Sequence, residues 1–235
     1  MSDDRESVRP EMLDRWLVRA AVAVVVTLQF SLIHNFSYGA RWLAPLVELI
    51  LLVPLTVLTL RAERLAWHAH TTQERESANM YRRANFALGM ALVLVVSLAN
   101  AASLLLLLKA LLAGKTLNGR TLLLDALNVW ATNVIVFSLW YWVLDRGGPW
   151  LDRRDHRGPA ELIFPRMTLP AGPVDTDARP GYVDYLFLSF NTSTAFSPTD
   201  TMPLTVRMKL LMMLEATVSL LTLLLVAARA VNILA

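Results

Sequence analysis

Residues 181–235 read GYVDYLFLSFNTSTAFSPTDTMPLTVRMKLLMMLEATVSLLTLLLVAARAVNILA and hold two apolar segments of unequal length. The second, Leu210–Ala228, is interrupted only by Glu215 and is long enough to cross a bilayer, which takes about 20 residues. The first, Tyr182–Phe190, is too short to cross. A short apolar helix just before a last span is typical of a re-entrant segment, and the alternative is a helix lying flat among the headgroups.

Four more apolar segments precede this stretch. Of the 235 residues, 55% are hydrophobic and 17% are charged, against about 45–50% and about 25% in soluble domains. The additional segments of spanning length are Leu17–Ile33, Trp42–Leu60, Phe86–Leu108 and Ala126–Leu144. The sequence therefore predicts an all-α integral membrane protein with five transmembrane helices and a short re-entrant helix between the fourth and the fifth.

The connections divide the chain into four parts. We expect an N-terminal tail (1–16), a four-helix transmembrane bundle (17–146), a Pro-rich loop without regular structure (147–180) and a C-terminal part (181–235) with the re-entrant helix, a Thr/Ser-rich loop and the last span. The charged stretch 61–83 is rich in helix formers and predicts helical extensions out of the membrane.

The basic residues indicate the orientation. Seventeen of the 22 Lys and Arg residues lie in the N-terminal tail and the start of the first span, or in the second and fourth connections, which are all on one side of the membrane. The positive-inside rule therefore places the N-terminus and the long loop in the cytoplasm. Nineteen of the 22 are Arg, which indicates a GC-rich bacterial genome, so the bacterial cytoplasmic membrane is the expected location.

The sequence also argues against several classes of protein. Cysteine is absent, which excludes thiolate nucleophiles and zinc–sulfur sites. We find no Ser-His-Asp, HExxH or paired-carboxylate motif, no Walker loop and no dinucleotide fingerprint. The basic residues form blocks between apolar runs, a pattern that does not suggest nucleic-acid binding. We therefore expect no enzymatic activity, no cofactor and no metal.

The C-terminal quarter resembles the pore module of tetrameric potassium-type channels. The matching features are the pore-helix candidate Tyr185–Phe190, the filter start Thr192-Ser193-Thr194, Asp200 after the filter, the Pro203-Leu204-Thr205 turn, and Leu214-Glu215 and Ala228-Arg229 in the last helix. Most of the chain also resembles a bacterial family of small membrane proteins of unknown function, common in actinobacteria, which share the five-span layout and the Ala195–Asp200 string. The first resemblance implies a homotetramer with a pore loop.

The filter departs from the channel pattern. A potassium filter needs a Gly-Tyr-Gly loop, but Ser197-Pro198-Thr199 stands there, and Pro198 restricts both its own backbone and that of Ser197. What fits is a wider constriction for monovalent cations, with Asp200 at its mouth. Its lining would be the hydroxyls of Thr192, Ser193, Thr194, Ser197 and Thr199. The alternative is a loop that caps the last helix. Channels of this type enter the filter from outside, whereas the charge count places the loop inside.

Several polar residues lie within the predicted spans. Ionisable groups there need partners, and matched depths predict the pairs Glu48–Arg229 and Arg19–Glu215. Glu215, Ser219, Thr222 and Arg229 form one stripe on the last helix, either a pore lining or an interhelical seam. Asn100, Asn128 and Asn133 are predicted to bond between helices, and Trp130, Trp140, Tyr141, Trp142 and Trp150 to form an aromatic belt.

Two functions follow as hypotheses. The first is a channel-like homo-oligomer in the lipid bilayer, with a tetramer favoured and a poorly selective cation pore lined by Thr192–Asp200. The alternative is a non-conducting membrane scaffold or accessory protein whose charged loops bind a partner.

Overall fold

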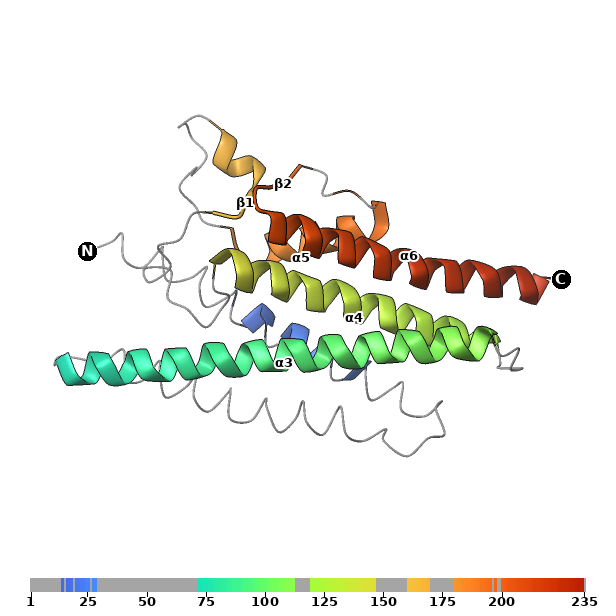
Figure 1. Ribbon diagram of the computed structural model, residues 1–235, viewed down its shortest axis with the longest axis horizontal. Helices are drawn as coiled ribbons and strands as arrows, with labels where there is room; N and C mark the ends of the chain where they lie inside the picture. The colour runs from blue at the N-terminus through green and yellow to red at the C-terminus, as the bar shows by residue number, and fades with distance from the viewer. Residues whose placement is uncertain are drawn as a thin grey trace.

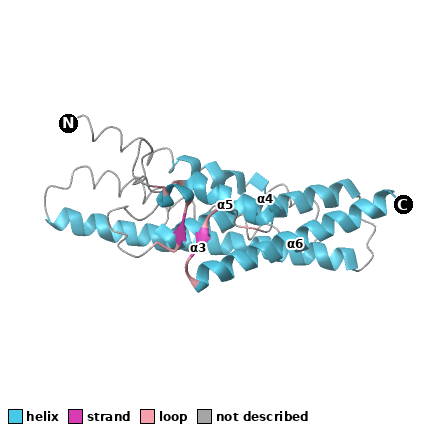
Figure 2. Ribbon diagram, turned by 90° about the horizontal axis from the view of Figure 1, so that it is seen from above, coloured by secondary structure: helices cyan, strands magenta, loops and turns pink. Residues whose placement is uncertain are grey.

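The computed structural model describes residues 14, 16–18, 20–25, 27–28, 72–112, 119–146, 160–169, 180–195, 197 and 200–234. The elements are α3 (Thr72–Leu112), α4 (Gly119–Arg146), β1 (Leu162–Ile163), η2 (Pro165–Thr168), α5 (Tyr182–Ala195), β2 (Met202–Pro203) and α6 (Val206–Leu234), shown in Figure 1 and, by type, in Figure 2. The end of the first predicted span and all of the second lie outside the described residues, and Trp16–Val25 forms a shorter apolar helix.

Three of the described helices are long and apolar enough to cross a membrane. Their apolar stretches are Phe86–Lys109 in α3, Leu123–Asp145 in α4 and Val206–Ala227 in α6, which coincide with the third, fourth and fifth predicted spans. α3 begins at Thr72, so the helix continues into part of the charged stretch before Phe86. The chain is thus a mostly helical protein with three helices suited to a bilayer.

α4 is the central helix of the described part. It packs against α3, α5 and α6, and most of its side chains between Ala126 and Asp145 are buried. α3 and α6 instead direct large apolar side chains outward, among them Leu98 and Leu105 on α3 and Leu210 and Met213 on α6. Such mainly apolar faces suit the hydrocarbon of a bilayer.

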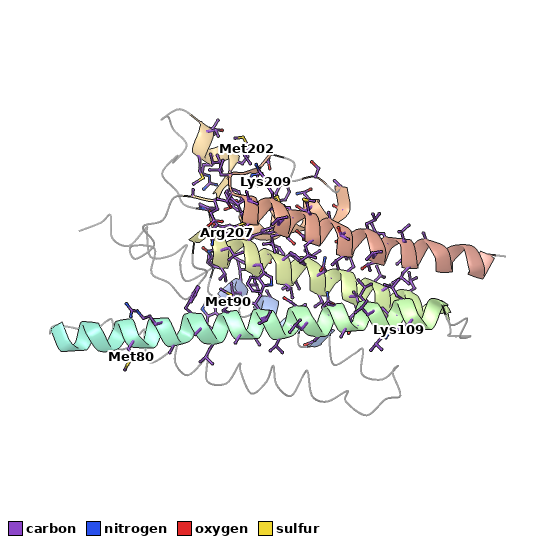
Figure 3. The ribbon with its side chains drawn as sticks, in the orientation of Figure 1. Met80, Met90, Lys109, Met202, Arg207 and Lys209 are labelled. Atoms are coloured by element: carbon purple, nitrogen blue, oxygen red, sulfur yellow. The ribbon has the colours of Figure 1, made fainter. Side chains whose placement is uncertain are left out.

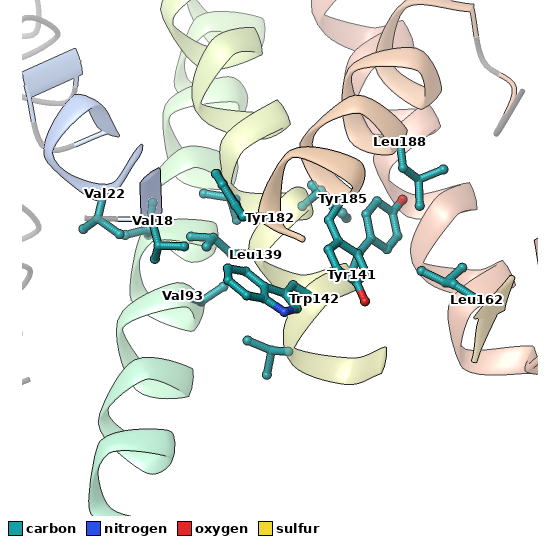
Figure 4. Close-up of a cluster of buried hydrophobic side chains, with 14 of the residues drawn as sticks. Val18, Val22, Val93, Leu139, Tyr141, Trp142, Leu162, Tyr182, Tyr185 and Leu188 are labelled. Carbon is teal, nitrogen blue, oxygen red and sulfur yellow. The ribbon is translucent and has the colours of Figure 1, made fainter. Parts of the chain in front are cut away.

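The aromatic part of the hydrophobic core lies near the C-terminal end of α4. The Trp142 ring lies 5.4 Å from that of Tyr182 and 6.0 Å from that of Tyr185, and Phe164 meets Tyr185 edge-on at 5.2 Å between ring centroids. Val18 and other aliphatic side chains complete the cluster (Figure 4). The aromatic-belt prediction is therefore wrong for Tyr141 and Trp142, which are buried in the protein.

α5 runs along only part of α4. It begins beside Trp142 and reaches Trp130, whose ring lies 5.8 Å from that of Phe190. These two tryptophans are about 18 Å apart along the axis of α4. The chain then returns to β2, which pairs antiparallel with β1 (Leu162↔Pro203 and Ile163↔Met202). α5 is thus entered and left at the same end of the bundle.

The Pro-rich connection contains more structure than the sequence suggested. β1 and the 3₁₀ turn η2 lie within 147–180, where no regular structure was expected. Pro165 stands at the start of η2, where its missing N–H is not needed. β1 is held because the N–H groups of Glu161 and Leu162 donate to Asp145 at 2.6 and 3.1 Å.

Candidate functional site

The candidate site centres on Glu215, a carboxyl group in the apolar part of α6 with no exposed surface. Its oxygens hydrogen-bond with the hydroxyls of Tyr141 on α4 and of Ser189 and Ser193 on α5, the last at 2.9 Å. Within the described residues, no Arg or Lys forms an ion pair with it. We call Glu215, Tyr141, Ser189 and Ser193 the carboxyl cluster. It joins α6 to both α4 and α5.

The polar stripe on α6 lies inside the protein. Glu215, Ser219 and Thr222 are all buried. Ser219 accepts a hydrogen bond of 3.1 Å from Asn133 on α4, and Thr222 donates to its own helix at Val218. Because the spacing of four and three residues keeps these side chains on one helix face, that face forms a seam with α4 and α5.

Two asparagines bond between helices, as predicted. Asn133 reaches Ser219 on α6, and Asn128 donates to the backbone oxygen of Leu28 at 2.6 Å. Bonds of this kind are common between membrane helices. Thus α4 is fastened on one side to α6 and on another to the N-terminal segment.

A second buried carboxylate marks the end of α4. Asp145 accepts the N–H groups of Glu161 and Leu162 on one oxygen, and the Tyr185 hydroxyl donates to the other at 2.7 Å. Asp145 therefore joins α4 to both β1 and α5. Sequence reasoning missed this role, since a carboxylate at the end of a span usually lies in solvent. The only signal was its position at the boundary of the apolar stretch.

The beginning of α5 is fixed by a third acidic side chain. Asp14 accepts the N–H of Tyr182 at 3.1 Å, and a Cβ on Gly181 would lie only 2.9 Å from the same carboxylate oxygen. Glycine therefore keeps room for this cap.

The Tyr182 hydroxyl is buried beside Ser138. Burial raises the pKa of Tyr182 to about 12, and its hydrogen bond with Ser138 opposes this rise, so this hydroxyl stays neutral at physiological pH.

The residues predicted to line a filter divide into two groups. α5 runs to Ala195, so Thr192 and Ser193 belong to a helix and are buried, with Thr192 bonded to the Leu188 oxygen at 2.9 Å. Thr194, Ser197 and Asp200 are exposed on the protomer. Thr199 lies outside the described residues. The predicted set is therefore not one ring of hydroxyls within the chain.

The predicted charge pairs fall largely outside the described part. Glu48 and Arg19 are not described, and neither is the side chain of Arg229, although its backbone lies in α6. An ion pair that was not predicted joins Arg207 at the start of α6 to Glu161, whose carboxylate also accepts the Thr205 hydroxyl at 3.0 Å. Among the described residues, no three His, Cys, Asp or Glu side chains gather in a way that could hold a metal.

No protein family matches this sequence, and no curated protein or solved structure matches it significantly.

Proposed function

We propose that this chain is a channel-like membrane protein that assembles as a homo-oligomer, with a tetramer favoured, in the bacterial cytoplasmic membrane. Five membrane passes and a cytoplasmic N-terminus belong to the same proposal. The observation that carries it is the path of α5, which enters the bundle beside Trp142, ends beside Trp130 and returns to the same end at β2. A half-length helix on such a path has the geometry of a re-entrant pore helix.

The direction in which the polar side chains point supports a pore axis that lies between protomers and not within one chain. The hydroxyls of Thr192 and Ser193 are buried and hydrogen-bonded inside the protomer. A path for ions through one protomer would have to break these hydrogen bonds. Thr194, Ser197 and Asp200 face outward. In a symmetric assembly around this surface, they would meet their copies, and the carboxylates of Asp200 would favour cations.

A second candidate function is a non-conducting scaffold. The observation that favours it is the buried stripe on α6, which serves as a seam in this protein and leaves a mainly apolar outward face with exposed Leu210, Met213 and Leu214. An inner helix of this kind would line a central cavity mainly with apolar side chains. Charged segments at the bundle ends would then bind a partner.

Flux through reconstituted vesicles distinguishes these two functions. We expect the wild type to carry monovalent cations, and Asp200→Asn and Thr194→Ala to reduce that flux by about tenfold or more, because each removes a polar group from the proposed axis. Thr27→Ala is the matched control: Thr27, like Thr194, is exposed and donates to the oxygen four residues earlier at 2.8 Å, but it lies in the N-terminal segment that packs on α4. The control should conduct as the wild type does.

The oligomeric state is measured on the same preparation, by native mass spectrometry in a nanodisc. The channel proposal requires a closed oligomer as well as flux. A monomeric protein that carries no ions would contradict it and leave the scaffold function.

A further inference from the structure

The carboxyl cluster contains four close oxygen–oxygen contacts. The Tyr141 hydroxyl contacts one carboxyl oxygen of Glu215, and Ser193 lies 2.9 Å from the other. Ser189 contacts that same oxygen and also lies 2.7 Å from the backbone oxygen of Val134 on α4. Since the acidic and hydroxyl side chains are all buried, the hydrogens must come from the cluster itself.

The hydrogens can be counted. Each contact at hydrogen-bond distance needs one hydrogen between its two oxygens, and the hydroxyls of Tyr141, Ser189 and Ser193 supply three for the four contacts. The Val134 oxygen is a carbonyl and supplies none. With an ionised Glu215, the single Ser189 hydrogen would have to serve two acceptors, and lone pairs would face each other across one short contact.

A proton on Glu215 completes the network. The acid then donates to Ser189, and Ser189 donates to the Val134 oxygen. Tyr141 and Ser193 donate to the carboxyl oxygens. Every contact in the cluster then has its own hydrogen, so α6, α5 and the backbone of α4 are joined in one chain of bonds.

The surrounding charges point the same way. In the described part of α4, the acidic residue nearest to Tyr141 along the helix is Asp145, one turn away. The acidic residue of α5 is Asp184, which lies in the first turn of that helix, before Ser189 and Ser193. The cations on the described part of α6, Arg207 and Lys209, lie at its exposed beginning (Figure 3). No described residue of α3 pairs with Glu215. An ionised carboxylate here would lie in an apolar interior without a cation, which is very costly.

We infer that Glu215 is a proton-binding site, a carboxylic acid whose proton links α6 to Ser189 on α5 and, through it, to α4. The ligand is a proton exchanged with water, and its release would leave one of the two Ser189 contacts without a hydrogen. This inference goes beyond the proposed function and does not depend on conduction, because the count concerns contacts within one protomer.

Infrared spectroscopy of the full chain in nanodiscs tests the inference. The difference spectrum between wild type and Glu215→Gln at about pH 7, where exposed carboxyls are ionised, should contain the C=O band of a protonated acid, shifted in heavy water. Glu161→Gln is the matched control, because Glu161 is also buried but forms an ion pair with Arg207. Its difference spectrum should contain carboxylate bands instead.

Two results would overturn the inference. One is a Glu215→Gln difference spectrum with carboxylate bands alone, as an ion pair with Arg19 would give. The other, which is decisive even if the variant does not fold, is a wild-type spectrum at about pH 7 without any acid C=O band. A protein that carries no ions but keeps this band would contradict the channel proposal and leave the proton site intact.

Discussion

Glu215→Leu is expected to lower the free energy of unfolding by about 2–4 kcal/mol. Leucine fills a similar volume but accepts no hydrogen bond. The hydroxyls of Tyr141 and Ser193 would then be buried without their acceptor, and Ser189 would lose the proton that Glu215 donates to it. Denaturant unfolding in mild detergent, followed by circular dichroism, measures this loss.

Glu215→Gln is the matched control for that substitution. Its amide can donate to Ser189 and Ser193 while its oxygen accepts the Tyr141 hydroxyl, so we expect at least half of the lost stability to return. Equal unfolding midpoints for the leucine and glutamine variants would contradict the role of the carboxyl cluster. Such a result would mean that the packing of α6, and not its hydrogen bonds, holds α5.

Asp145→Ala is expected to cost about 3–4 kcal/mol, because it removes the acceptor of three donors at once. Two of these donors are the backbone N–H groups of Glu161 and Leu162, and the third is the Tyr185 hydroxyl. β1 would lose its attachment to α4, and with it the pairing that returns the chain from α5. Thermal unfolding in detergent gives the size of the effect.

Two controls separate the parts of this joint. Tyr185→Phe removes one donor and keeps the ring stacked on Trp142, so we expect a loss of about 1 kcal/mol. Asp184→Ala removes only the local contact with the Gly181 N–H at 2.8 Å, and a similar small loss is expected. If Asp145→Ala were no more harmful than either control, Asp145 would not be the joint between α4, β1 and α5.

The sequence predicted the long helices well, because uninterrupted apolar length is a local property. The stretches Phe86–Lys109 and Val206–Ala227 can be recognised without knowing what they pack against. The C-terminal end of α5 was harder to predict from the sequence. A run of Ser and Thr suggests a loop, but α5 continues to Ala195, and the hydroxyls of Thr192 and Thr194 donate to the backbone oxygens four residues earlier instead of ending the helix.

The carboxyl cluster was only half predictable. The spacing of Glu215, Ser219 and Thr222 showed one polar face, but its partners come from α4 and α5, which are far away in the sequence. Tyr141 stands between two tryptophans and therefore resembled a member of an interfacial belt. Its burial against Glu215 depends on how α4 and α6 are rotated, and a single sequence contains no signal for that rotation.

Cysteine cross-linking in native membranes measures whether α5 enters the bundle to about half its depth and leaves at the same end. The chain contains no cysteine, so any disulfide within the chain must form between the two introduced cysteines. We predict that Trp130→Cys with Phe190→Cys and Ile163→Cys with Met202→Cys both cross-link, and that Lys109→Cys with Met202→Cys, at opposite ends in Figure 3, does not. Failure of the first pair would mean that α5 lies flat at the surface. Failure of the second would mean that the chain does not return to β1. Either result would contradict the re-entrant path of α5.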